Sequence, residues 1–155
     1  MSKVWFITGS SRGLGRSFAE AALARGDEVA ATARDVGSLD ALTAYGAAVL
    51  PHKLDVTDKA AVFDAVRQTR QHFGRLDVIV NNAGYGLFGA VEELSDKDLR
   101  DQLETNLFGP LWGVQAALPI MREQGGGHII QISSTGGQVS LPLGRAAREG
   151  APSRR

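Results

Sequence analysis

The stretch from Val4 to Gly15, VWFITGSSRGLG, constrains the fold of this chain more than any other. Its first four residues are β-branched, aromatic or aliphatic, which is typical of a buried strand. Glycines follow at 9, 13 and 15, and helical periodicity continues through Leu14, Phe18, Ala21 and Ala22. A strand, a glycine turn and a helix N-terminus bring backbone N–H groups and the positive end of the helix dipole to one spot, which favours an anion. Glycines allow the tight turn and let a pyrophosphate approach the backbone.

Composition excludes several classes of function. The 155 residues suit one domain with a sizeable core, and the 17 basic and 17 acidic residues cancel, so nucleic acid and anionic membranes are not predicted partners. There is no cysteine, and the histidines at 52, 72 and 128 share no ligand spacing, so no metal site is predicted. No leader-like segment precedes the first strand, and no apolar run approaches the ~20 residues that span a bilayer. We therefore expect a cytoplasmic protein.

Strand and helix patterns alternate along the rest of the chain. Further strands are predicted at Glu28–Ala33, Ala48–Leu54, Leu76–Val80 and His128–Ile132. A short helix is predicted over Gly37–Tyr45, and a second runs from an N-cap at Thr57 to Gly74. A third, longer helix begins at a Ser95/Asp98 capping pair and carries leucines at 99, 103, 107 and 111. Pro110 and Pro119 are expected to kink or divide this third helix. This alternation predicts an α/β fold, a Rossmann-type doubly wound parallel sheet with strand order 3-2-1-4-5. Ligands should lie at the carboxyl ends of the strands, near the switch between strands 1 and 4.

Three short motifs follow predicted strands: TGxxxGxG over Thr8–Gly15, NNAG over Asn81–Gly84 and ISS over Ile132–Ser134. At this spacing they resemble the short-chain dehydrogenase/reductase family, and the resemblance covers residue 3 to about residue 143. The strand before the glycine turn and the helix after it supply the context that the motif requires. The resemblance implies an NAD(P)-dependent oxidoreductase that transfers hydride between the nicotinamide and the carbonyl or secondary alcohol carbon of a small molecule. The NNAGYG stretch is faintly similar to members that act on hydroxysteroid-like or retinol-like substrates.

Two arginines favour NADP over NAD as the cofactor. Arg34 follows the second strand, roughly 20 residues after the glycine turn, where an arginine accepts the NADP 2′-phosphate and a carboxylate would bind the NAD ribose. Arg12, within the turn, offers a second guanidinium to the same phosphate. Asp35, one residue past the acidic position, is the argument for NAD. Two solvated surface arginines are the plain alternative.

The resemblance assigns the remaining cofactor contacts. It implies that the turn residues Gly9, Ser11, Arg12, Gly13, Leu14 and Gly15 surround the phosphates. Asp55 and Val56 would lie at the adenine, and Asn82, Ala83 and Gly84 at the ribose and nicotinamide. Asp55 as a cap of the following helix is a competing interpretation.

Two polar residues are candidates for the chemistry. The resemblance implies that the Ser134 hydroxyl hydrogen-bonds the substrate oxygen and stabilises the charge that develops there; a serine that merely ends a strand is the alternative. Asn106 interrupts an apolar helical face, and the resemblance implies that it kinks the helix and holds a water for a proton relay. A buried polar residue with a local backbone partner is the plainer interpretation.

The YxxxK pair of the family is missing from this sequence. There the tyrosine is the general acid/base, and the lysine lowers its pKa from about 10 and binds the ribose. The matching positions hold Ala147 and Ala151, the only tyrosines are Tyr45 and Tyr85, and the last lysine is Lys97. Tyr85 could border the substrate pocket, but no lysine is placed to depress its pKa. We therefore expect little or no turnover.

Residues 1–143 are expected to form the dinucleotide-binding domain, the front part of a reductase that lacks the family's last strands and helices. The fifth strand would then be an exposed edge, and part of the contacts of the family's usual homo-oligomers would be missing. Residues 144–155, GRAAREGAPSRR, are predicted to be a disordered tail from a frameshifted or misassembled ending. The alternatives are an NADP(H)-binding module without catalysis, an unproductive fragment, and association with nucleic acid or an anionic surface through tail arginines. The neutral body argues against the last.

Overall fold

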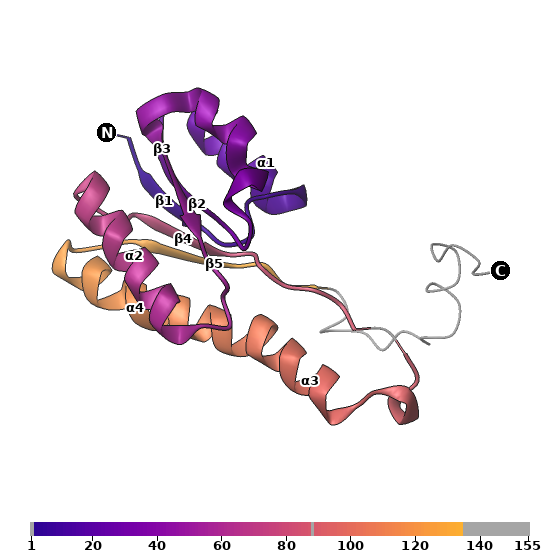
Figure 1. The fold of residues 1–155 in the computed structure, drawn as a ribbon. Helices are drawn as coiled ribbons and strands as arrows, with labels where there is room; N and C mark the ends of the chain where they lie inside the picture. The colour runs from indigo at the N-terminus through magenta and orange to yellow at the C-terminus, as the bar shows by residue number, and fades with distance from the viewer. Residues whose placement is uncertain (1, 88, 135–155) are drawn as a thin grey trace.

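The computed structural model describes residues 2–87 and 89–134, so the predicted tail lies outside the described residues. Five parallel strands form one sheet in the order β3-β2-β1-β4-β5, which confirms the predicted fold class and topology (Figure 1). The strands are β1 (Val4–Ile7), β2 (Glu28–Ala33), β3 (Val49–Lys53), β4 (Val78–Asn81) and β5 (His128–Gln131). Each begins within two residues of its predicted start.

The helices cover the two faces of the sheet. They are α1 (Gly13–Ala24), the 3-10 helix η1 (Val36–Ala48), α2 (Lys59–Phe73), the short η2 (Val91–Glu93), α3 (Asp96–Leu103), the π-helical turn η3 (Glu104–Phe108) and α4 (Gly109–Glu123). In Figure 1, α1 lies on one side of the sheet, and α2 and α4 lie side by side on the other. This is the doubly wound arrangement in which a central parallel strand is covered twice.

Strand β1 shows how the core is divided between the two faces. Phe6 packs into a cluster with Val62 and Val66 of α2 and Ala117 of α4. Its neighbour Ile7 belongs to the other cluster, with Ala19 and other residues of α1. Both β1 side chains are fully buried, as alternation on a strand covered from both sides requires.

Two helix starts differ from the predictions. Helix α2 is capped by Asp58, whose carboxylate accepts the Ala61 N–H at 3.0 Å. Thr57, the predicted cap, instead donates its hydroxyl to the Asp55 carboxylate. Leu14 does not belong to the core face of α1 and is 59% exposed. It lies in the first turn, which begins beyond the end of β1, so no sheet surface lies beneath it. The buried face of α1 consists of Gly15, Ala19, Ala22 and Leu23.

The predicted long helix is divided into α3, η3 and α4. The Ser95/Asp98 capping box at its start is confirmed. Pro110 is the second residue of α4, directly after the π-helical turn, and Pro119 lies inside α4. Helix α3 buries no residue and extends away from the sheet (Figure 1). The predicted row of leucines is 42–54% exposed, with Leu99 and Leu103 in α3, Leu107 in η3 and Leu111 in α4.

Candidate nucleotide-binding site

The glycine turn joins β1 to α1 at the carboxyl end of the sheet. Gly9 and Gly13 have φ values of +71° and +58°, a left-handed backbone that favours glycine. Ser10 holds the turn in place through its backbone and its side chain. Its N–H donates to the Thr32 carbonyl at 2.8 Å, and its hydroxyl donates to the Ile7 carbonyl at 2.9 Å. The turn therefore has a defined shape without a ligand.

Thr8 and Asn82 join the ends of β1 and β4. The Thr8 hydroxyl accepts the N–H groups of Asn82 at 2.9 Å and Ala83 at 3.0 Å and donates to the Val80 carbonyl at 3.3 Å. The Asn82 amide donates to the carbonyls of Thr8 at 2.9 Å and Gly9 at 3.1 Å. The TG and NNAG motifs are thus two halves of one structure, as the position of both at the switch point requires.

Gly15 is needed for packing within this structure. A Cβ at Gly15 would overlap the Gly9 carbonyl and the Asn82 amide, and one at Gly9 would lie 3.1 Å from the Ala83 Cα. Around Gly13, by contrast, nothing lies within 4 Å of a Cβ position. Two of the three glycines are therefore explained by the close approach of the turn to the NNAG segment, and the third by its backbone conformation.

The N-terminus of α1 lacks a side-chain cap. The N-cap residue is Arg12 in an extended conformation, it makes no capping hydrogen bond, and the first turn of the helix contains no acidic residue. Among residues 2–87 and 89–134, no side chain caps the first N–H groups of α1, and these groups and the positive end of the helix dipole face the turn formed by Ser11, Gly13 and Leu14. An anion would satisfy both.

Arg34 and Arg12 flank this region. Both side chains are exposed, Arg34 just after β2 and Arg12 in the turn, and neither forms an ion pair within residues 2–87 and 89–134. Asp35 accepts the Gly37 N–H at 3.1 Å and caps η1. The carboxylate next to Arg34 therefore has a structural partner already.

Asp55 and Val56 follow β3. The Asp55 carboxylate accepts the Thr57 N–H at 3.0 Å and the Thr57 hydroxyl at 2.8 Å. The N–H bond is the main cause that lowers the pKa of Asp55; burial opposes it, and the Thr57 hydroxyl and the charge of Arg34 add to it. Asp55 thus shapes the turn before α2, while Asp58 caps the helix. Val56 is buried, and its side chain lies 3.1 Å from a Cβ position at Gly109 of α4.

Asn106 lies in the π-helical turn η3 and reaches across to the loop after β4. Its Oδ1 accepts the Tyr85 N–H at 3.1 Å and its Nδ2 donates to the Tyr85 carbonyl at 2.8 Å. Gln102 donates to the same carbonyl at 3.3 Å. The interpretation of Asn106 as a buried residue with a local partner is wrong, because the side chain is exposed and its partner is 21 residues away. Asn106 fixes the backbone that continues from Gly84.

Ser134 is the last described residue before position 135, at the same carboxyl edge of the sheet. The Ile132 N–H donates to the Asn81 carbonyl at 3.0 Å, so the ladder between β4 and β5 extends almost to Ser134. The Ser134 residue is exposed. The positions of the absent YxxxK pair, Ala147 and Ala151, lie outside the described residues.

Two motif residues that were not assigned to the candidate site also organise this edge. Thr8 connects β1 to the NNAG segment, and its signal was its place directly before the first glycine of the motif. Asn81 donates to the Pro110 carbonyl at 3.2 Å and thereby fastens β4 to the start of α4. Its place in the NNAG motif was visible, but the partner was not.

Within the described ranges, no set of three or more histidine, aspartate or glutamate side chains is arranged to hold a metal ion. Over the same residues, no helix has the length and apolar character needed to cross a bilayer.

The fold and the strand-end motifs define a Rossmann-like doubly wound α/β protein of the kind built around a dinucleotide site. The family model described as short chain dehydrogenase matches residues 3–146, and the chain belongs to this family. The oxidoreductase BOA17 of Botryotinia fuckeliana is 50% identical over 144 residues, which are 92% of this chain and 53% of that protein.

Solved structures agree with this assignment. A short-chain dehydrogenase from Streptomyces avermitilis superimposes with a TM-score of 0.87 at 45% identity, covering 90% of this chain and 52% of that one. The protein ElxO, solved with NADP bound, superimposes with a TM-score of 0.85 at 31% identity, covering 92% of this chain and 60% of its own. The chain thus spans about half the length of the curated relatives it matches.

Proposed function

We propose that this short-chain oxidoreductase binds NADP(H) across the carboxyl ends of β1, β2 and β4. The observation that carries the proposal is the uncapped N-terminus of α1, which opens at the switch point between β1 and β4 with the exposed guanidiniums of Arg12 and Arg34 nearby. A dinucleotide needs an anion site for its pyrophosphate at this place in a doubly wound sheet.

The choice of NADP over NAD rests on Arg34 and Asp35. Arg34 and Arg12 have no ion-pair partner in the described part of the chain and suit a dianionic 2′-phosphate. Asp35 is engaged in capping η1, so its carboxylate is not directed to a ribose hydroxyl. NADP bound to the structural neighbour ElxO supports the same choice.

Each strand end contributes a part of the proposed cofactor site. Gly9, Ser11, Gly13, Leu14 and Gly15 border the pyrophosphate, and Asp55 with Val56 borders the adenine. Asn82, Ala83 and Gly84 would lie against the ribose and nicotinamide. The hydrogen bonds between Thr8 and Asn82 support this assignment, because they hold the glycine turn and the NNAG segment in one arrangement.

The proposed reaction is the reduction of a small carbonyl compound, or the reverse oxidation of a secondary alcohol, in the cytoplasm. When bound, NADPH would supply the hydride. The Ser134 hydroxyl would donate a hydrogen bond to the substrate oxygen and stabilise its developing charge. Asn106 would position Tyr85 and the loop that borders the substrate. The sequence contains no Tyr-x-x-x-Lys, so the proton-transfer contribution of about 10²–10⁴-fold should be absent and turnover should be small.

Titration of the folded chain with NADPH and with NADH, followed by nucleotide fluorescence, tests the proposal. We expect saturable binding of NADPH and weaker binding of NADH. Carbonyl-dependent oxidation of bound NADPH would indicate a working reductase, and binding without oxidation a nucleotide-binding module. If neither NADPH nor NADH binds at millimolar concentration, the assignment of the site is refuted.

A further inference from the structure

Three arginines belong to the segments around the proposed 2′-phosphate site, and one of them differs from the other two in its surroundings. Arg12 and Arg34 are exposed and form no ion pair within residues 2–87 and 89–134. The side chain of Arg16, in the first turn of α1, is only 21% exposed, and its Nε donates to the Glu20 carboxylate at 2.8 Å. The guanidinium of Arg16 is therefore mostly covered and already engaged.

The Nη1 atom of Arg16 bridges two segments that α1 and β2 separate in the sequence. It lies 3.4 Å from the carbonyl oxygen of Ser11, in the glycine turn, and 3.5 Å from that of Ser38, in η1. Both contacts are at the long end of the hydrogen-bond range, so each is weak alone. The ion pair with Glu20 holds the planar guanidinium and thereby the direction of Nη1.

Each of these two carbonyls is connected through the backbone to an arginine of the proposed site. Ser11 immediately precedes Arg12. Ser38 donates its N–H to the Asp35 carbonyl at 3.2 Å and its hydroxyl to the same oxygen, and Asp35 is the residue after Arg34. The Nη1 bridge thus joins the turn that carries Arg12 to the turn that carries Arg34.

Residues 34–38 are held by few other contacts. All of them are exposed, and burial resumes only at Leu39. Within the described part of the chain, Arg16 is the one side chain of another element that hydrogen-bonds to this segment. The position of the segment relative to the glycine turn consequently depends on Arg16.

We propose that Arg16 is a positioning residue for NADP(H): it sets the separation of Arg12 and Arg34, and so the preference for a 2′-phosphate, without binding the phosphate itself. This role rests on the proposed function of the site. A dianion held by two guanidiniums depends on their separation, because charge-assisted hydrogen bonds are short and directional. NADH lacks the 2′-phosphate, so its affinity should hardly depend on Arg16.

Substitutions of Arg16 test the effect on cofactor preference by fluorescence titration with NADPH and NADH. Arg16→Met keeps the apolar stem and removes the guanidinium. It should lower NADPH affinity about 3–10-fold, as expected for the loss of a modest hydrogen-bonded contact, and change NADH affinity less than about twofold. Arg16→Lys should lose nearly as much, since one ammonium cannot replace the fork that reaches Glu20 and both carbonyls together.

Arg25→Met is the matched control. Arg25 caps the other end of α1, forms an ion pair with Asp27 and lies over the ring of Trp5. The substitution therefore removes an engaged arginine from the same helix, at the end away from the glycine turn. Both nucleotide affinities should stay within about twofold of the unmodified chain.

Two further variants separate positioning from a direct effect of charge. In the Arg34→Ala background, Arg16→Met should cause little further loss of NADPH affinity, because Arg16 acts through Arg34; a direct phosphate contact would give additive losses. Glu20→Ala releases the guanidinium of Arg16 but keeps its charge. It should lower NADPH affinity about 2–5-fold. If Arg16 acted by charge alone, removal of the neighbouring carboxylate would raise this affinity.

The unmodified chain separates failure of this role from failure of the proposed function. If it shows no preference for NADPH over NADH, the proposed function fails and the role of Arg16 fails with it. If it prefers NADPH, the role alone is overturned by an unchanged ratio of the two affinities in Arg16→Met, by equal losses for both nucleotides, or by a Glu20→Ala affinity that does not fall. Circular dichroism establishes that the variants are folded. If Arg16→Met does not fold, Glu20→Ala, at a side chain that is 49% exposed, decides.

Discussion

The hydroxyl of Thr8 lies between the backbone N–H groups of Asn82 and Ala83, and the Asn82 side chain returns two hydrogen bonds to the carbonyls of Thr8 and Gly9. The glycine turn and the NNAG segment are thereby one unit. The ends of two strands that are more than 70 residues apart in sequence are held together before any ligand binds.

Thr8→Val should be destabilising because it removes the acceptor of two N–H groups without changing the shape of the side chain. An unsatisfied buried donor costs about 1–3 kcal/mol, so we expect a loss of about 2–4 kcal/mol in the free energy of unfolding, measured in urea. Ser17→Ala removes an exposed hydroxyl bonded within α1 and should stay within about 0.5 kcal/mol. Equal effects of the two substitutions would contradict the role given to Thr8.

Gly15→Ala should destabilise the chain more than Gly13→Ala. The first places a Cβ against the Gly9 carbonyl and the Asn82 amide and should cost about 1–3 kcal/mol. The second meets open space and pays only for the left-handed backbone, about 1 kcal/mol. Gly126→Ala, with open space and an ordinary φ, is the neutral control. The order of the three thermal midpoints is the measurement, and a reversed order would be inconsistent with the packing described.

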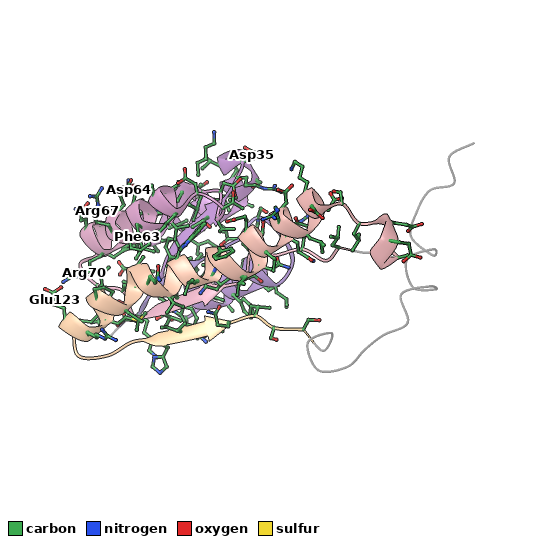
Figure 2. All side chains as sticks on the ribbon, turned by 90° about the horizontal axis from the view of Figure 1, so that it is seen from below. Asp35, Phe63, Asp64, Arg67, Arg70 and Glu123 are labelled. Atoms are coloured by element: carbon green, nitrogen blue, oxygen red, sulfur yellow. The ribbon has the colours of Figure 1, made fainter. Side chains whose placement is uncertain are left out.

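Arg34→Ala should reduce NADPH affinity about 10–100-fold and leave NADH affinity nearly unchanged, because a charge-assisted hydrogen bond is worth about 1.5–3 kcal/mol. Arg67→Ala is the matched control. Figure 2 shows Arg67 on α2, well apart from Asp35, the residue that follows Arg34. Fluorescence titration of both variants with both nucleotides gives the comparison. A parallel loss for NADPH and NADH would argue against a 2′-phosphate contact.

Asp77 should make the chain sensitive to acid. It is only 9% exposed and accepts the Val4 N–H at 2.8 Å and two bonds from Arg75 at 2.7 and 2.6 Å. Burial raises the pKa of Asp77, but the bonds from Arg75 and Val4 outweigh it, so the pKa lies below its ordinary value of 3.8.

A carboxyl group whose pKa is lower in the folded state stabilises the fold above its unfolded pKa, and this stabilisation is lost as the pH falls through the folded pKa. The urea midpoint should therefore decline below about pH 4. In Asp77→Asn the midpoint should be lower at pH 7 and decline less with acid. Asp64→Asn, at an exposed ion pair of α2, should follow the unmodified chain. An acid profile unchanged by Asp77→Asn would assign the sensitivity to other groups.

The sequence predicted the sheet well because its strands are short apolar runs whose neighbours are set by crossover rules. The same information could not predict which residues of α1 and α3 are buried. Leu14 and Leu99 are apolar and correctly spaced, but their surroundings depend on where each helix extends beyond the sheet. Thr57 resembled a helix cap, yet Asp55 engages it and Asp58 takes the role.

The sequence predicted which residues form the candidate site, but only some of the contacts that these residues make. Gly9, Gly15 and Asn82 were assigned to a cofactor, whereas the structure shows that they also pack on one another. The partner of Asn106 was not predictable, since it depends on how η3 directs the side chain toward Tyr85. Pairings between distant segments of this kind are set by tertiary packing and leave no local pattern.

The π-helical turn η3 sets the angular phase between α3 and α4. A helix advances by roughly 100° per residue, so deleting one residue from Glu104–Phe108 to restore regular α-helix would rotate α3 by about that angle relative to α4. The Asn106 amide would swing away from Tyr85, and the loop that it holds would lose its anchor. The one extra residue of this π-helical turn thus determines whether Asn106 can reach Tyr85, and with it the position of the loop after β4.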